Sequence, residues 1–98
     1  MKEILNQFFE IEQKITNQQI TTLGRNIKRL HHEFEREGFI LKNPIGEKFS
    51  ELRTDMDATI MGELNNKLIV TKVLKPIIYQ KQNEELILIQ KAVVIVGN

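Results

Sequence analysis

The segment GFILKNPIGEKF, residues 38–49, decides how the fold of this chain is interpreted, because the sequence changes character across it. Before it, apolar residues recur at helical spacing among many charged ones, and after it the chain becomes rich in Ile, Val and Leu. Gly38 suits the left-handed residue that ends a helix. Pro44 fixes φ and Gly46 tolerates φ > 0, which is turn chemistry. The sequence therefore predicts an α+β fold, with a helical region at 1–38 and a small β domain at 39–98.

Two apolar stripes at steps of three and four residues precede Gly38, as is typical of amphipathic helices. They are out of phase, and Thr16 or Asn17 could cap a new helix between them. We therefore expect two helices joined by a short turn, with one long kinked helix as the alternative. Gly24 indicates either close packing inside the second helix or a boundary shifted toward it. The stripes are Ile4, Phe8, Ile11 and Ile15, then Ile20, Leu23, Ile27, Leu30 and Phe34.

These apolar stripes are too large for the adjacent β domain to cover alone. A chain of 98 residues also buries only about 60–65% of its unfolded surface, so its own core is marginal. Pairing of the helices between two copies would cover the stripes. We therefore expect a homodimer held by the helical region. The expected interface residues are Ile4, Phe8, Ile11, Ile15, Leu23, Ile27, Leu30 and Phe34.

The β region contains two long segments of high strand propensity, Lys67–Tyr79 and Glu85–Val96. The polar run Gln80–Glu84 between them suggests an antiparallel hairpin with a loop of about five residues. Pro76 lacks an N–H, so it should end a strand or lie at an edge or a bulge. The second segment is apolar on both faces, so we expect both faces to be covered. Shorter elements are a strand at Ala58–Met61 and a loop at Ser50–Asp57.

The side chains that enzymes need are scarce. The chain has no Cys, which removes thiol catalysis, disulfides and thiolate zinc sites together. Ser50 is the only serine and lies in no nucleophile elbow, and no glycine-rich phosphate loop occurs. His31 and Glu35 could share a metal, but two ligands do not make a site. Asp55 and Asp57 in a polar loop are interpreted as solvated. We expect a protein that is not an enzyme and carries no cofactor or metal.

The charge distribution does not favour nucleic acid as a partner. The net charge is +1, and 14 basic residues are interspersed with 13 acidic ones. The second stripe carries a local basic group, Arg25, Lys28, Arg29 and Arg36. Glutamates interleave with this group, and no aromatic side chain is placed for base stacking. A solvated, ion-paired helix face is the preferred interpretation.

The chain shows no sign of a membrane-spanning or secretory segment. Its longest uninterrupted apolar run, Ala92–Val96, is far shorter than the roughly 18–20 residues of a membrane span. Residues 1–7 contain no apolar core of a signal peptide. We expect a cytoplasmic protein with no membrane partner.

The junction resembles that of the GrpE family, nucleotide exchange factors of DnaK-type chaperones. In that family a glycine ends the helix, and a Pro-x-Gly-Glu-x-Phe element then begins the β domain. Gly38, Pro44, Gly46, Glu47 and Phe49 fall at those spacings. The segment from Leu23 to Gly38 resembles the second bundle helix, Val70, Val73 and Leu74 resemble a Val-x-x-Val-Leu strand, and Ile89, Ala92, Val94 and Val96 resemble the closing strand.

The sequence also departs from the family pattern. Ser50 and Glu51 replace an Asp-Pro pair, and Met56 replaces a histidine. Pro76 replaces a Gly-Tyr neighbourhood, and Gln90 stands where an arginine is usual. The chain begins at the bundle, without the long paired-helix stalk of the family. These differences bear mainly on whether exchange activity is retained.

The resemblance implies a mechanism. Two chains would form a four-helix bundle, and one β domain would insert against the ATPase domain of a DnaK-type chaperone, opening its cleft so that ADP leaves. The residues expected to bind the chaperone are Glu47, Lys48, Gln90, Lys91 and Val96. Two alternatives remain: a dimeric adaptor without exchange activity, and a small nucleic-acid-binding dimer that uses the basic second helix.

Overall fold

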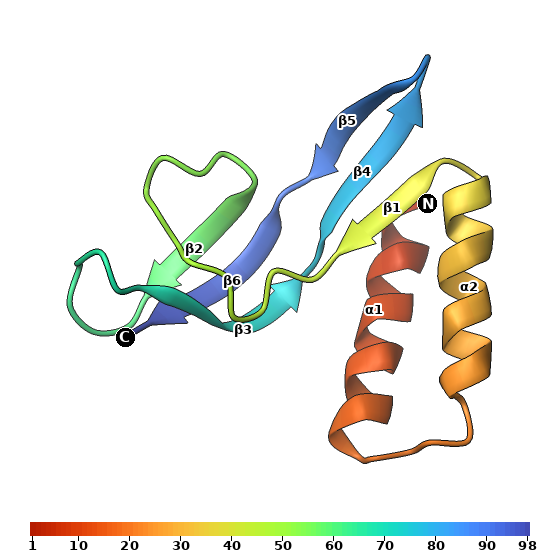
Figure 1. Ribbon diagram of the computed structural model, residues 1–98, viewed down its shortest axis with the longest axis horizontal. Helices are drawn as coiled ribbons and strands as arrows, with labels where there is room; N and C mark the ends of the chain where they lie inside the picture. The colour runs from red at the N-terminus through yellow and green to blue at the C-terminus, as the bar shows by residue number, and fades with distance from the viewer.

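Gly38 separates two helices from six strands in the computed structural model, which describes all 98 residues (Figure 1). Its φ is +90°, and its N–H donates to the Glu35 carbonyl at 2.9 Å, so it ends the second helix as predicted. The α+β class is confirmed. In chain order the elements are α1 (Lys2–Asn17), α2 (Gly24–Arg36), β1 (Phe39–Lys42), β2 (Met56–Ile60), β3 (Ile69–Lys75), β4 (Ile77–Gln82), β5 (Glu85–Gln90) and β6 (Ala92–Gly97).

The two-helix prediction is confirmed, but the predicted capping residues were wrong. Thr16 and Asn17 belong to α1, which ends in a Schellman-type turn: the Ile20 N–H donates to the Ile15 carbonyl at 3.0 Å, and Gln19 donates to Thr16 at 3.1 Å. Gln19 holds the left-handed position, φ +56°, that glycine usually occupies. The second helix therefore starts later than expected.

The linker between the helices absorbs part of the second predicted stripe. Ile20 lies in the linker, Leu23 is the residue immediately before α2, and Gly24 is the first residue of that helix. The start of the second helix is thus shifted to Gly24. Of the two explanations offered for this glycine, close packing and a shifted boundary, the second is correct. The apolar stripe of α2 itself is reduced to Ile27, Leu30 and Phe34.

Fully buried residues of the helices occur only in the first half of α1. Leu5, Phe8 and Phe9 are buried, whereas no residue from 10 to 37 is buried. The Phe8 ring packs against the Phe34 ring, with 5.2 Å between centroids. The far half of the helical hairpin extends beyond the strands (Figure 1). Most of its surface therefore has no partner within the chain.

The strands form two three-stranded sheets, with strand orders β1-β4-β5 and β2-β6-β3. All neighbours are antiparallel except β2 and β6, which run parallel. Each long predicted strand is divided between the sheets: Pro76 separates β3 from β4, and Lys91 separates β5 from β6. The expectation that Pro76 ends a strand is confirmed.

The hairpin between β4 and β5 has a two-residue turn, so the predicted five-residue loop was wrong. Asn83 and Glu84 both have positive φ, 48° and 67°. Two left-handed residues give the type I′ twist that matches paired strands, so the ladder continues through Gln82 and Glu85. Similarly, β2 begins at Met56, two residues before the predicted start, and takes residues that were assigned to the preceding loop.

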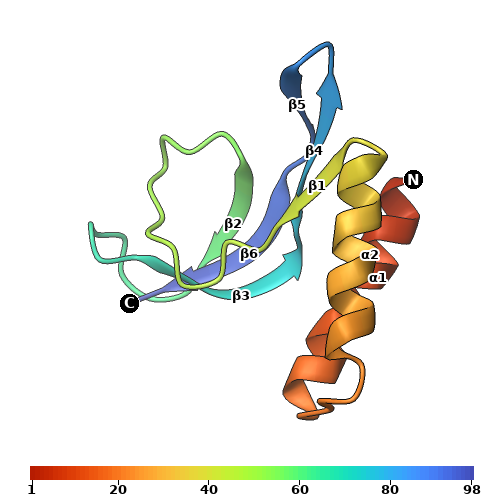
Figure 2. The ribbon, with the colours of Figure 1, turned by 45° about the vertical axis from the view of Figure 1, so that its right-hand side comes forward.

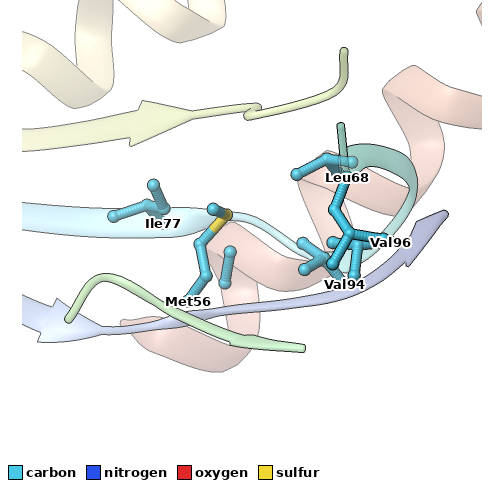
Figure 3. Close-up of a cluster of buried hydrophobic side chains, with 7 residues drawn as sticks. Met56, Leu68, Ile77, Val94 and Val96 are labelled. Atoms are coloured by element: carbon cyan, nitrogen blue, oxygen red, sulfur yellow. The ribbon is translucent and has the colours of Figure 1, made fainter. Parts of the chain in front are cut away.

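The main core consists of seven apolar residues, six from the β2-β6-β3 sheet or the loop before β3 and one, Ile77, from β4 (Figure 3). Both faces of β6 are at least half covered, as expected, but β5 is not: Leu86, Ile87 and Leu88 are 54%, 38% and 36% exposed. Figure 2 shows why, because the β4–β5 hairpin projects past the other strands. The core residues are Met56, Leu68, Val70, Ile77, Ala92, Val94 and Val96.

Candidate partner-binding surfaces

Glu47 and Lys48 lie in the loop between β1 and β2, directly after the predicted turn. The Glu47 N–H donates to the Pro44 carbonyl at 3.0 Å, and Gly46 has φ +79°, which confirms the turn. Backbone bonds also fasten the loop to β3: Gly46 donates to the Val70 carbonyl, and Val70 donates to the Glu47 carbonyl, both at 2.9 Å. The position of Lys48 is therefore set by the backbone on both sides.

Arg53, which belongs to the same loop, holds it together through hydrogen bonds. Its guanidinium donates to Glu47 Oε1 at 3.1 Å, to the Lys48 carbonyl at 3.1 Å, and to Asp55 Oδ2 at 2.8 Å. The hydrogen bonds from Arg53 hold the pKa of Asp55 below its ordinary value, and those from Asp55 raise the pKa of Arg53. The interpretation of Asp55 as a solvated carboxylate like Asp57 was therefore wrong. The Arg-x-Asp spacing within a loop was the signal for this contact.

A groove with a volume of about 450 Å³ opens beside Lys48, between this loop and the loop from β2 to β3. Leu52 and Leu64 line it and are 89% and 62% exposed. Its floor includes Phe49 and the buried Leu68. The two loops lie at the end of the β domain that is far from the helices (Figure 1). Sequence reasoning missed this groove, although a leucine in each of two polar loops was a signal for it.

Gln90 and Lys91 lie at the crossing from one sheet to the other and do not form one patch with the loop residues. The Gln90 amide donates to Asn6 Oδ1 at 2.8 Å and to the Pro76 carbonyl at 2.9 Å, and accepts from Asn6 Nδ2 at 2.9 Å. Its hydrogen-bonding groups are thus used to join α1 to the strands. Lys91 is exposed, and its Nζ lies 4.0 Å from Asp57 Oδ1.

Val96 is fully buried, so the expectation that it is exposed for a partner was wrong. It lies on β6, the central strand of its sheet, and is opposite Ile60 on one side and Val70 on the other. Alternate residues of β6 point into the core, and Val96 belongs to that set.

The expected dimer-interface residues differ in how far their own chain covers them. Phe8 is buried within its own chain, and Leu23 lies outside both helices. Ile15, Ile27 and Phe34 are half-buried. Ile4, Ile11 and Leu30 are 59%, 51% and 43% exposed, and we refer to these three as the uncovered helix surface.

The polar side of α2 is basic but interrupted. A shallow hollow there is lined by Arg25, Lys28, Arg29, His32 and Glu33. Glu33 also accepts from the Arg36 guanidinium at 3.2 Å, a solvated ion pair of the expected kind.

His31 binds across the helical hairpin rather than along α2. Its Nε2 lies 2.9 Å from Glu12 Oε2 on α1, and not beside Glu35, the residue considered with it as a possible metal ligand. No group of three or more potential metal-ligating side chains occurs. Neither helix has both the length and the apolar character that a membrane span requires.

The arrangement therefore offers two surfaces for binding, the uncovered helix surface and the Leu52–Leu64 groove, at opposite ends of the molecule. Comparison with known proteins adds no relative: no family model, no curated protein and no solved structure matches this chain.

Proposed function

We propose that this protein is a GrpE-like co-chaperone, a homodimer whose β domain binds the ATPase domain of a DnaK-type chaperone and promotes ADP release. The observation that carries the proposal is the separation of two binding surfaces on either side of the Gly38 junction. A helical hairpin with an uncovered apolar surface supports dimerisation. A β domain with an exposed groove at its far end supports binding to a second protein.

The accessible area supports the dimer. The chain exposes 7,094 Å², whereas a folded monomer of 11.5 kDa exposes about 5,800 Å². The excess of about 1,300 Å² exceeds the roughly 800 Å² that each partner buries in a standard interface. Much of this excess lies on the helical hairpin, since residues 10–37 contain no buried side chain, and the β4–β5 hairpin contributes as well. Two hairpins packed on Ile4, Ile11 and Leu30 would form the four-helix bundle.

The groove supports the contact with the chaperone. Leu52 and Leu64 are the most exposed leucines of the β domain, and Lys48 adds a cation beside them. Because the groove lies at the end far from the helices, dimerisation leaves it accessible. Its walls are held by backbone bonds to β3 and by Arg53, so little ordering would be needed on binding.

Exchange would follow from unequal affinity for two states of the chaperone. A ligand shifts a conformational equilibrium only by binding one state better than the other. The β domain would bind the open nucleotide cleft better than the closed one, and by reciprocity ADP would weaken the complex. The protein would supply no reactive group of its own.

Stopped-flow release of a fluorescent ADP analogue tests this function. The dimer should accelerate release, and Leu52→Asp should abolish the acceleration because it places a carboxylate in the groove. Leu74→Asp is the matched control, since Leu74 is 46% exposed on β3 and is not among the residues that line the groove. Unchanged release with bound protein would refute exchange and favour the adaptor. Absence of binding would refute both.

A second candidate is a nucleic-acid-binding dimer, favoured by the hollow in which Arg25, Lys28, Arg29 and His32 surround one carboxylate. Binding of this kind weakens steeply as salt rises. A gel shift of DNA or RNA that is lost in Arg25→Glu but retained in Leu52→Asp would support it over the chaperone function.

A further inference from the structure

The outer edge of β5 is the most exposed apolar strand edge of this protein. β5 is the last strand of the β1-β4-β5 sheet, and Leu86, Ile87 and Leu88 in its middle are all exposed. Apart from its ladder with β4, no backbone hydrogen bond involves residues 85–90. Soluble proteins usually protect such edges with charges, proline or a covering segment.

The other edges of the two sheets are protected in these ways. The outer side of β3 receives backbone bonds from the loop at 46–49, and β1 lies beside α2. β2 is short and carries the exposed polar residues Asp57 and Thr59. β5 has a charge at Glu85 and a bulge at Ile89, but its middle, Leu86 to Leu88, has neither. The unprotected part of the sheet edges is therefore specific to this segment, which points to a partner there.

The turn geometry indicates which backbone groups of β5 are available. Gln82 and Glu85 flank a two-residue turn, so they form a hydrogen-bonded pair, and the next pair, Lys81 with Leu86, does not. Leu86 and Leu88 therefore direct their N–H and C=O groups away from β4. Another strand can add to this edge through them.

The charges along β5 are complementary to a second β5 running in the opposite direction. Glu84 and Glu85 precede the apolar residues, and Lys91 follows them. When two copies pair antiparallel with Leu88 opposite Leu88, Glu85 of each copy lies near Lys91 of the other, which follows β5 after the bulge at Ile89. Opposite charges at facing positions stabilise strand pairs, and like charges destabilise them. Because the interface has two-fold symmetry, the contact between Glu85 and Lys91 occurs twice.

We propose that β5 pairs antiparallel with β5 of a second copy of this chain, which would join two three-stranded sheets into one of six strands. The contact uses no residue of the uncovered helix surface. It therefore stands independently of the proposed co-chaperone function and of the helical dimer. A chain that uses both contacts would assemble beyond the dimer.

Charge exchange tests the pairing, with association measured by sedimentation equilibrium at low salt. All variants carry Ile11→Asp and Leu30→Asp, so that pairing of the helices does not contribute. Glu85→Lys and Lys91→Glu should each weaken self-association about tenfold, because two charge pairs become repulsive in every contact. The double variant should restore it, and the two single variants should associate with each other when mixed. Single variants that associate like the parent, or a double variant that does not recover, would overturn the proposal.

Cross-linking provides a second measurement that does not depend on charge. The chain has no Cys, so Leu88→Cys introduces one thiol at the expected two-fold axis. Facing strand residues have a Cα separation of about 5.5 Å, which a disulfide can span. Mild oxidation should yield a covalent dimer of Leu88→Cys much faster than of Thr54→Cys, an exposed control in a loop. Equal rates for the two variants would contradict the pairing.

Discussion

Replacing Ile11 and Leu30 together with aspartate should abolish the proposed pairing of the helices without unfolding the chain. Ile11 is 51% and Leu30 43% exposed in the single chain. Full burial of such a side chain contributes about 1.5–3 kcal/mol, so covering the exposed half contributes about 1 kcal/mol. A symmetric dimer contains each residue twice, which gives about 4 kcal/mol, or roughly a thousandfold in Kd. Burying aspartates in the bundle would add to this loss.

Sedimentation equilibrium at micromolar concentration measures the change, and circular dichroism checks that helix content is retained. Both chains carry Glu85→Lys, which weakens pairing of β5. In this background the chain with native helices should sediment at twice its 11.5 kDa mass and the double variant at 11.5 kDa. Leu74→Asp is the matched control, because it places the same charge on an equally exposed position of β3. If the chain with native helices is monomeric at this concentration, the argument from accessible area is refuted. A variant that remains dimeric would refute the assignment of the interface.

Three further predictions concern stability. Gly46→Ala should lower the free energy of unfolding, measured in urea, by about 1 kcal/mol. The cause is the φ of +79° alone, since an added Cβ would meet no atom within 4 Å. Unchanged stability would contradict this prediction. Because Arg53 holds the pKa of Asp55 below its ordinary 3.8, the stabilisation by this pair is complete above that pH and is lost as pH falls through the lowered pKa. Asp55→Asn should therefore unfold with a weaker pH dependence than wild type below about pH 4, measured by thermal unfolding. Gln90→Ala should destabilise the fold by about 1–3 kcal/mol, because the polar groups of Asn6 and Pro76 lose their partner. Its affinity for the chaperone should not change. Unchanged stability with weakened chaperone binding would instead place Gln90 in the binding surface.

Local backbone chemistry made part of the fold predictable. Gly38 and Gly46 have the positive φ that their neighbours implied, and Pro76 ends a strand because it lacks an N–H. Two boundaries were predicted wrongly because the residue that sets them is neither glycine nor proline: the end of α1 and the turn between β4 and β5. Gln19 ends α1 in a left-handed conformation, and Glu84 completes a tight turn, although neither residue type favours φ > 0.

The candidate site depended on pairing between distant segments, which a local pattern does not report. Val96 is buried because β2 and β3 flank β6, and no local pattern showed that β6 would be the central strand. Gln90 is occupied because it meets Asn6, 84 residues away. The groove likewise depends on two loops meeting beyond β2. Only the turn at Gly46, which precedes Glu47 and Lys48, followed from local sequence.

The two sheets share one continuous ribbon, and this has a mechanical consequence. β3 continues into β4 through Pro76 alone, and β5 into β6 through Lys91 alone, so the same two lengths of chain run through both sheets. The bend where they cross is packed, since Pro76, Ile77 and Ala92 are all buried, and the Gln90 amide bridges it to the Pro76 carbonyl. A force applied at the hairpin tip should therefore turn the whole β domain as one lever about the Gly38 junction, instead of folding one sheet against the other.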